Sequence, residues 1–394
     1  MIHSTPLNTA YEAKNRIIFL DGIRGWASFA VILSHTIACF LSPSTPLLNY
    51  YGEFGKQRLL NDIAYKNYLD IFCGIISRLI TDGHLAVLIF FVLTGYALSA
   101  SHLNQKKQNL ALATTARYFR LMIPILFTSL IAYLLLKFGL FFNLEVATTP
   151  EKSLRWLGTF YKFDANFFEM LKFSLFDVFF KYNDETTYNA TLWTMSIEII
   201  GSFFIYSYLG IFRSTERIYW RLTVCALLAL MLFSPYFACF LSGHVIAELN
   251  KKYLTNHLIY KRHIQIALLF VFLITAILST VFRGDERVTF AIATTLVFVT
   301  SFSVILKKIF STKISEYMGK ISFPLYLIQI PVICSLSSYL YNALPTLGFS
   351  VFESNLINLI ITIIVCLLAS ALLLPIEKLS ILYSKKIGDL FLNN

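Results

Sequence analysis

The sequence predicts an all-α fold, a polytopic transmembrane bundle of about ten helices with both termini in the cytoplasm. Of its 394 residues, 57% are hydrophobic and only 14% are charged, whereas a soluble domain carries about 25% charged residues. Apolar runs close to the ~20 residues that a bilayer requires recur along the chain. Lys and Arg concentrate in alternate short loops, as in cytoplasmic loops of membrane proteins. We therefore expect one integral membrane domain over residues 1–394, with no attached soluble domain.

The apolar segments predict the positions of the spans. They are residues 17–41, 83–101, 121–143, 190–212, 219–233, 235–250, 263–282, 288–306, 322–342 and 355–376. Ser234-Pro235 divides one apolar run into two, because proline breaks or kinks a helix. Merging the two halves would move the basic loop after residue 250 to the outside, against the usual charge bias. The net charge of +11 is thus explained by topology and does not indicate nucleic-acid binding.

Two of the loops on the outer side are long, residues 42–82 and 144–189. The second contains the segment Phe163–Asn183, whose phenylalanines recur at spacings of three and four. This spacing favours an amphipathic helix that lies on the membrane surface or re-enters the membrane.

The cysteines do not indicate a disulfide framework or a metal site. There are six, Cys39, Cys73, Cys225, Cys239, Cys334 and Cys366. All but Cys73 lie in apolar segments, and none belongs to a C-x-x-C pair. We interpret them as small core residues and expect no metal.

Arg24 and His35 lie in the first apolar segment and are eleven residues apart. In a helix this spacing amounts to three turns plus about 20°, so the two side chains share one face about 16 Å apart along the axis. Ionisable groups inside a membrane are costly and by default mark a functional cavity. The alternative is that Arg24 reaches the interface and His35 bonds a neighbouring helix.

Glu198 in the fourth span is expected at a depth similar to that of His35. A carboxylate beside an imidazole fixes the tautomer of the ring and stabilises its protonated form. His35 would then be suited to take a proton from an alcohol. A purely structural contact between His35 and Glu198 inside the bundle is an equal alternative.

Two arginines mark the cytosolic start of the third span. Arg117 and Arg120 are three residues apart on one helix face. The planar guanidinium group of arginine presents paired N–H donors that match the oxygens of phosphate. The two arginines predict a phosphate site, the alternative being ordinary topology-setting charge. Asp21 is three residues before Arg24 and could pair with it, or it could complement the helix dipole.

Other polar or small groups fall inside predicted spans. Thr94-Gly95 would permit close helix contact or plain packing. The ninth span contains Pro324 and Pro331, which loosen the helix and expose backbone groups. Gln329 could line a cavity or join helices. We expect a substrate cavity lined by Asp21, Trp193, Tyr326 and Gln329.

Several motifs occur together in a fixed order. They are Leu20-DGIRGWASFAVILSHT, Phe90-FVLTGY, Arg117-YFRLMIP, Leu192-WTMSIE and Met318-GKISFPLYLIQIP. Along nearly the whole chain this ordered set resembles the acyltransferase-3 family of integral membrane acyltransferases.

The resemblance implies a ten-helix enzyme of the bacterial inner membrane. It would move an acyl group, usually acetyl from cytosolic acetyl-CoA, to a hydroxyl of an extracytoplasmic polysaccharide or glycolipid. By analogy, His35 would be the catalytic histidine and Arg24 its essential companion. Arg117 and Arg120 would bind the CoA part of the donor. Acetyl-CoA as donor substrate is the only cofactor implied.

Two positions depart from the family pattern. Leu88 and Ile89 stand where an acidic residue often precedes the Phe-Phe pair, and Gln329 stands where a histidine is usual. Because an amide does not titrate, Gln329 cannot transfer a proton, although it can form hydrogen bonds.

The expected mechanism has His35, oriented by Glu198, take the acceptor proton while Arg24 or a backbone N–H stabilises the oxyanion by ~3–4 kcal/mol. A covalent acyl group on His35 fits the same residues. A transporter or flippase of a lipid-linked or small polar substrate is the alternative from another class, although the chain lacks the repeated halves typical of transporters. A regulatory protein that has lost activity is a third reading, kept open by Gln329.

Overall fold

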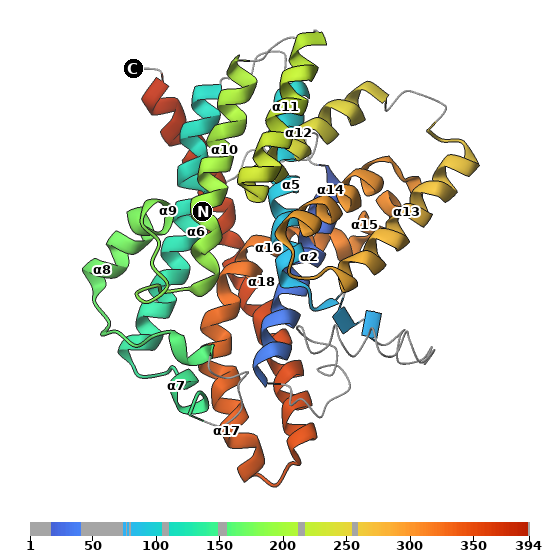
Figure 1. Cartoon of the computed structure of the whole chain (residues 1–394). Coiled ribbons are helices and arrows are strands. Elements are labelled where there is room, and N and C mark those ends of the chain that lie inside the picture. Colours follow the sequence, from blue (N-terminus) through green and yellow to red (C-terminus); the bar gives the residue numbers. More distant parts are fainter. Residues whose placement is uncertain are drawn as a thin grey trace.

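The computed structural model describes residues 17–40, 74–75, 77–78, 80–104, 110–148, 156–211, 217–253 and 259–392. Within these residues every regular element is a helix (Figure 1). The predicted all-α bundle of membrane helices is thereby confirmed. Cys39, Cys239, Cys334 and Cys366 are buried free thiols, as interpreted from sequence. Cys73 lies outside the described residues, and so do the side chain of Cys225 and most of the loop over residues 42–82.

Each predicted span contains one long helix or a bent pair. The long helices are α2 (Ile18–Phe40), α5 (Gly83–Asn104), α6 (Leu110–Lys137), α10 (Trp193–Ile211), α11 (Arg217–Phe233), α12 (Pro235–Tyr253), α13 (Arg262–Val281), α14 (Glu286–Phe302), α16 (Lys313–Val332) and α18 (Val351–Leu392). The short ones are α7 (Asn143–Val146), η3 (Leu157–Thr159), α8 (Phe167–Lys172), η4 (Phe173–Asp177), α9 (Val178–Phe180), η5 (Ala190–Leu192), α15 (Val304–Phe310), η6 (Ile333–Ser337) and α17 (Ser338–Thr346).

By length and composition, six of the described helices could cross a membrane, and the pair α14–α15 would make a seventh. The count of ten spans and the cytoplasmic termini remain predictions. The division at Ser234-Pro235 is confirmed, because α11 ends at Phe233 and α12 begins at Pro235. The 100° bend between α14 and α15 was not predicted. The Ser303 side chain caps α15, and the Gln265 amide oxygen accepts the freed backbone N–H of Val304 at 2.8 Å.

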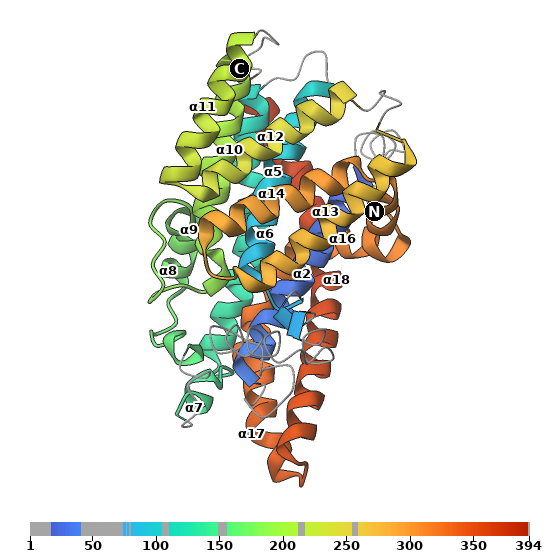
Figure 2. The same cartoon turned by 45° about the vertical axis from the view of Figure 1, so that its right-hand side comes forward.

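Helices α2 and α16 lie together at the centre of the bundle (Figures 1 and 2). Their backbones approach so closely that a Cβ atom on Gly25 would lie 2.4 Å from the Met318 carbonyl carbon. A glycine also allows close contact between α5 and α12, where a Cβ on Gly95 would lie 2.0 Å from the Phe240 carbonyl oxygen. The close contact expected at Thr94-Gly95 is therefore present, and α2 is fixed in register against α16.

Proline frees backbone groups in α16, as expected. Pro331 has no N–H, so the carbonyl of Leu327, four residues earlier, loses its helical donor. The Asn189 side-chain amide donates to that carbonyl at 2.5 Å, and its oxygen accepts from the backbone N–H of Thr191 at 3.2 Å. One side chain thus joins the Pro331 turn of α16 to η5, the short turn that leads into α10.

The phenylalanine-rich segment α8–η4–α9 lies lengthwise along α6. The ring of Phe167 meets Tyr133 at 5.9 Å, and the ring of Phe179 meets Tyr118 at 5.2 Å. The Tyr118 hydroxyl also donates to the Leu175 carbonyl. Tyr118 and Tyr133 are fifteen residues apart, or about 22 Å along α6. Because α6 is one of the candidate spans, this arrangement favours a segment that re-enters the membrane over one that lies flat.

Candidate active site

Arg24 and Asp21 form the ion pair that their spacing predicted. The Arg24 Nη1 atom is 3.6 Å from Asp21 Oδ1, one turn earlier in α2. The guanidinium therefore points toward the start of α2. Since His35 is three turns further along in the opposite direction, the head of Arg24 is directed away from the imidazole.

His35 contacts Gln329 across the α2–α16 interface. The two are joined by a hydrogen bond of 3.1 Å between Nδ1 and Oε1. Gln329 is fully buried, and its Nε2 atom donates to the Tyr326 carbonyl at 3.1 Å. A carbonyl can only accept, so the amide nitrogen must face Tyr326 and the amide oxygen must face His35. Nδ1 of His35 therefore carries the proton, and Nε2 keeps the lone pair that a general base requires.

Trp156 covers the other side of His35. The two rings stack with centroids 5.3 Å apart and planes 21° from parallel. Phe160 meets the indole edge-on at 4.8 Å and 86°. Trp156 was not predicted as a site residue, because the local sequence of the loop over residues 144–189 does not indicate which helix the loop packs against.

The expectation that Glu198 orients His35 is wrong. Glu198 instead forms a hydrogen-bonded ion pair with Arg117, and the Thr94 hydroxyl donates to its Oε1 atom at 2.9 Å. Arg117 also donates from Nε to the Ser202 hydroxyl at 3.0 Å. Glu198 was paired with His35 because a similar depth was expected, but its contact with Arg117 places the carboxylate at the level of the arginines and not at the level of His35.

Arg120 differs from Arg117 in being exposed. Protein atoms nevertheless surround its guanidinium, and the charged groups near it are Arg24 on α2, Arg117 on α6 and Glu377 on α18. Arg117 is paired with Glu198, so Arg120 is the arginine of the two that has no carboxylate within ion-pair distance among the described residues. The arginine cluster therefore lies near the beginning of α2 and α6, at the opposite end of α2 from His35.

Of the four residues expected to line one substrate cavity, Gln329 and Tyr326 are joined on α16, whereas Asp21 lies on α2 and Trp193 on α10. Asp21 is at the start of α2, and Gln329 is behind the His35 ring. The Tyr326 hydroxyl donates to the Thr191 carbonyl at 2.9 Å and is buried. The ring of Trp193 meets Tyr236 of α12 edge-on at 6.0 Å. Of the four, Gln329 is the residue that is hydrogen-bonded to His35 in the described part of the chain.

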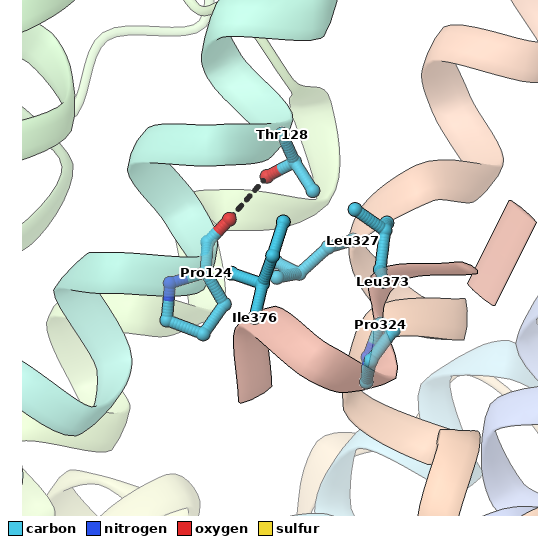
Figure 3. Close-up of a pocket in the computed structure, with 6 residues that line it drawn as sticks. All are labelled: Pro124, Thr128, Pro324, Leu327, Leu373 and Ile376. Carbon is cyan, nitrogen blue, oxygen red and sulfur yellow. Dashed lines mark hydrogen bonds between the residues drawn. The ribbon is translucent and has the colours of Figure 1, made fainter. Parts of the chain in front are cut away.

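Two cavities in the described structure lie away from these residues. A cavity of about 10 Å³, room for about one water molecule, lies between α6, α16 and α18 (Figure 3). Its lining is Pro124, Thr128, Pro324, Leu327, Leu373 and Ile376. A wider groove of about 350 Å³ is lined by Leu232, Phe233, Pro235, Asp285, Glu286 and Arg287. Neither cavity contains His35 or Arg24 in its lining.

The arrangement combines an oriented base with a remote anion site. Nε2 of His35 can accept a proton, and the arginine cluster can bind phosphate oxygens. In the part of the chain that the structure describes, no three His, Cys, Asp or Glu side chains gather as metal ligands would.

Comparison with known families extends over most of the chain. The family model described as an acyltransferase domain, Acyl_transf_3, matches residues 17–375. No curated protein and no solved structure matches the chain. The matched region contains every residue of the candidate site, from Asp21 to Gln329.

Proposed function

Because the chain belongs to the acyltransferase-3 family and is a membrane acyltransferase, we propose that it moves an acetyl group from cytosolic acetyl-CoA to a carbohydrate hydroxyl. The acceptor would be an extracytoplasmic polysaccharide or glycolipid, and the enzyme would reside in a bacterial inner membrane. The observation that carries this proposal is the chain His35–Gln329–Tyr326 carbonyl, which leaves Nε2 of His35 as a base.

The proposed step begins with removal of the acceptor proton. Nε2 of His35 takes the proton of the hydroxyl as its oxygen forms a bond to the carbonyl carbon of the thioester. The carbon–sulfur bond then breaks, and the CoA thiolate receives that proton from His35. The products are a carbohydrate ester and free CoA. Gln329 performs the orienting role that we had expected of Glu198, but it supplies no negative charge.

The donor site is proposed at the arginine cluster. Arg120 would bind the phosphates of CoA, because Arg117 is neutralised by Glu198 and Arg120 is the more exposed residue of the two. Arg24 points toward the same end of α2. It therefore fits a role in holding the donor better than a role at the oxyanion beside His35. The oxyanion would then be stabilised by a backbone N–H.

The mass of surface glycans tests this proposal in living cells. Cells that express the native chain should produce glycans heavier by one acetyl group than cells without it. His35→Ala should remove that difference, whereas His263→Ala, a change at an exposed histidine on α13, should keep it. Glycans that are identical with and without the native chain would contradict the proposed acceptor class, and a surviving difference in His35→Ala would contradict the role of His35.

A further inference from the structure

Trp156 is the feature of the site that the mechanism above does not use. Although it stacks on His35, its side chain remains 39% exposed. The ring centroids are 5.3 Å apart, whereas the planes of stacked rings lie about 3.5 Å apart. The rings are therefore displaced sideways by ~4 Å. Part of the indole therefore extends past the imidazole, on a residue that keeps over a third of its surface accessible.

The backbone that follows Trp156 is held by side-chain hydrogen bonds and ring contacts. The buried Asn143 amide donates to the carbonyls of Leu157 at 2.8 Å and of Phe160 at 3.1 Å. Tyr161 has a φ of 59°, which a residue with a side chain adopts only when its surroundings hold it there. Its ring stacks on Phe141 at 3.7 Å, and its hydroxyl donates to the Tyr188 carbonyl at 3.0 Å.

We propose that Trp156 is the floor of the acceptor subsite and binds the face of a pyranose ring next to His35. This inference rests on the proposed function. A pyranose presents a face of C–H groups, which packs on an aromatic ring, and an edge of hydroxyls. A sugar on the overhanging part of the indole would lie beside the imidazole, with one hydroxyl directed at the ring edge that carries Nε2.

The same floor would favour the sugar over water. A base that activates a hydroxyl also activates water, and water attack would convert the thioester to free acid and CoA. A sugar ring on Trp156 fills the space beside Nε2 and excludes water from it. Trp156 is thus a specificity-determining residue, which decides whether the acyl group goes to carbohydrate or to water.

The test uses the full chain in detergent, with labelled acetyl-CoA and, as acceptor probe, host surface glycan stripped of its esters by mild alkali. Trp156→Ala should raise the KM for glycan by roughly tenfold or more, while the KM for acetyl-CoA stays at the native value. The share of acetyl-CoA lost to hydrolysis should rise. Trp156→Phe should divide the acetyl group between glycan and water almost as the native chain does. Phe168 is an exposed aromatic residue on α8, and Phe168→Ala should give native values.

A second readout does not depend on turnover. Diethylpyrocarbonate modifies neutral imidazoles, so the rate at which His35 reacts, followed by peptide mass spectrometry, reports its accessibility. Glycan should slow this reaction in the native chain and not in Trp156→Ala. An unchanged glycan KM and unchanged protection in Trp156→Ala would overturn the subsite. Absence of any acetyl transfer by the native chain would overturn the proposed function instead, and the subsite with it.

Discussion

The side-chain oxygen of Gln329 accepts a hydrogen bond from Nδ1 of His35 at 3.1 Å. The opposite end of the same amide donates to the Tyr326 carbonyl. This relationship lets Gln329 orient His35 without itself titrating. It fixes one tautomer of His35 through a backbone acceptor that cannot change its protonation, so the base is oriented at every pH at which the helices remain packed.

Gln329→Leu should therefore lower kcat by about 10- to 100-fold, the usual effect of removing the partner that orients a functional histidine. The KM for acetyl-CoA should stay near the native value, because the proposed donor site is at the other end of α2. Steady-state kinetics of acetyl transfer would measure both constants. Gln265→Leu is the matched control, since Gln265 is a buried glutamine that bonds the backbone of the α14–α15 bend. A kcat for Gln329→Leu equal to the native value would show that His35 needs no orientation from α16.

Glu198 should prove to be a structural partner of Arg117. Replacing one member of a buried ion pair leaves the other charge uncompensated, at a cost of about 3–5 kcal/mol. Glu198→Leu should therefore lower the thermal unfolding midpoint in detergent, and Arg117→Met combined with Glu198→Leu should recover much of the loss. If Glu198→Leu is as stable as the native chain but does not turn over, Glu198 has a catalytic role and not only a structural one.

Arg120→Ala should weaken binding of the donor through its phosphates. Loss of a hydrogen bond to a charged group should raise the KM for acetyl-CoA by about 10- to 100-fold. S-acetylpantetheine, which lacks the nucleotide phosphates, should be used equally well by the native chain and by Arg120→Ala. Arg287→Ala, at an exposed arginine on α14, serves as the control. If Arg120→Ala uses acetyl-CoA and S-acetylpantetheine less well by the same factor, Arg120 acts on something other than phosphate.

The contact between α2 and α16 should not tolerate a larger residue at position 25. Gly25→Val places side-chain carbons where the Met318 backbone already lies, and overpacking of this kind costs about 1–3 kcal/mol or more. The yield of monodisperse protein in detergent would measure the effect. Gly210→Val on α10 should be tolerated, because a Cβ there would meet only Leu110 Cδ1 at an ordinary 3.6 Å. Equal yields for the two variants would contradict the close approach.

The sequence predicted those features that are encoded within one helix. The division at Ser234-Pro235 and the pair Asp21–Arg24 follow from proline chemistry and helical spacing, and the structure has both. The early start of α6, at Leu110 in place of residue 121, was missed because apolar content marks where a span begins and not where a helix begins.

Contacts between helices were predicted less well. Counting residues from the expected ends of the spans placed Glu198 at the depth of His35, but such a count does not determine how far one helix is shifted along its axis relative to another. Packing between helices sets that shift, as the close approach of α2 to α16 at Gly25 does for these two helices. The partners of Glu198 and the place of Trp156 depend on this packing, so sequence spacing alone could not give them.

Transfer of label from acetyl-CoA to glycan is the measurement that tests the central claim most directly. Membranes that contain the native chain are incubated with acetyl-labelled CoA and de-esterified surface glycan, beside membranes that contain His35→Ala. We predict label in the glycan with the native chain and background label with His35→Ala at equal protein levels. Equal labelling in the two samples would contradict the assignment of His35 as the base.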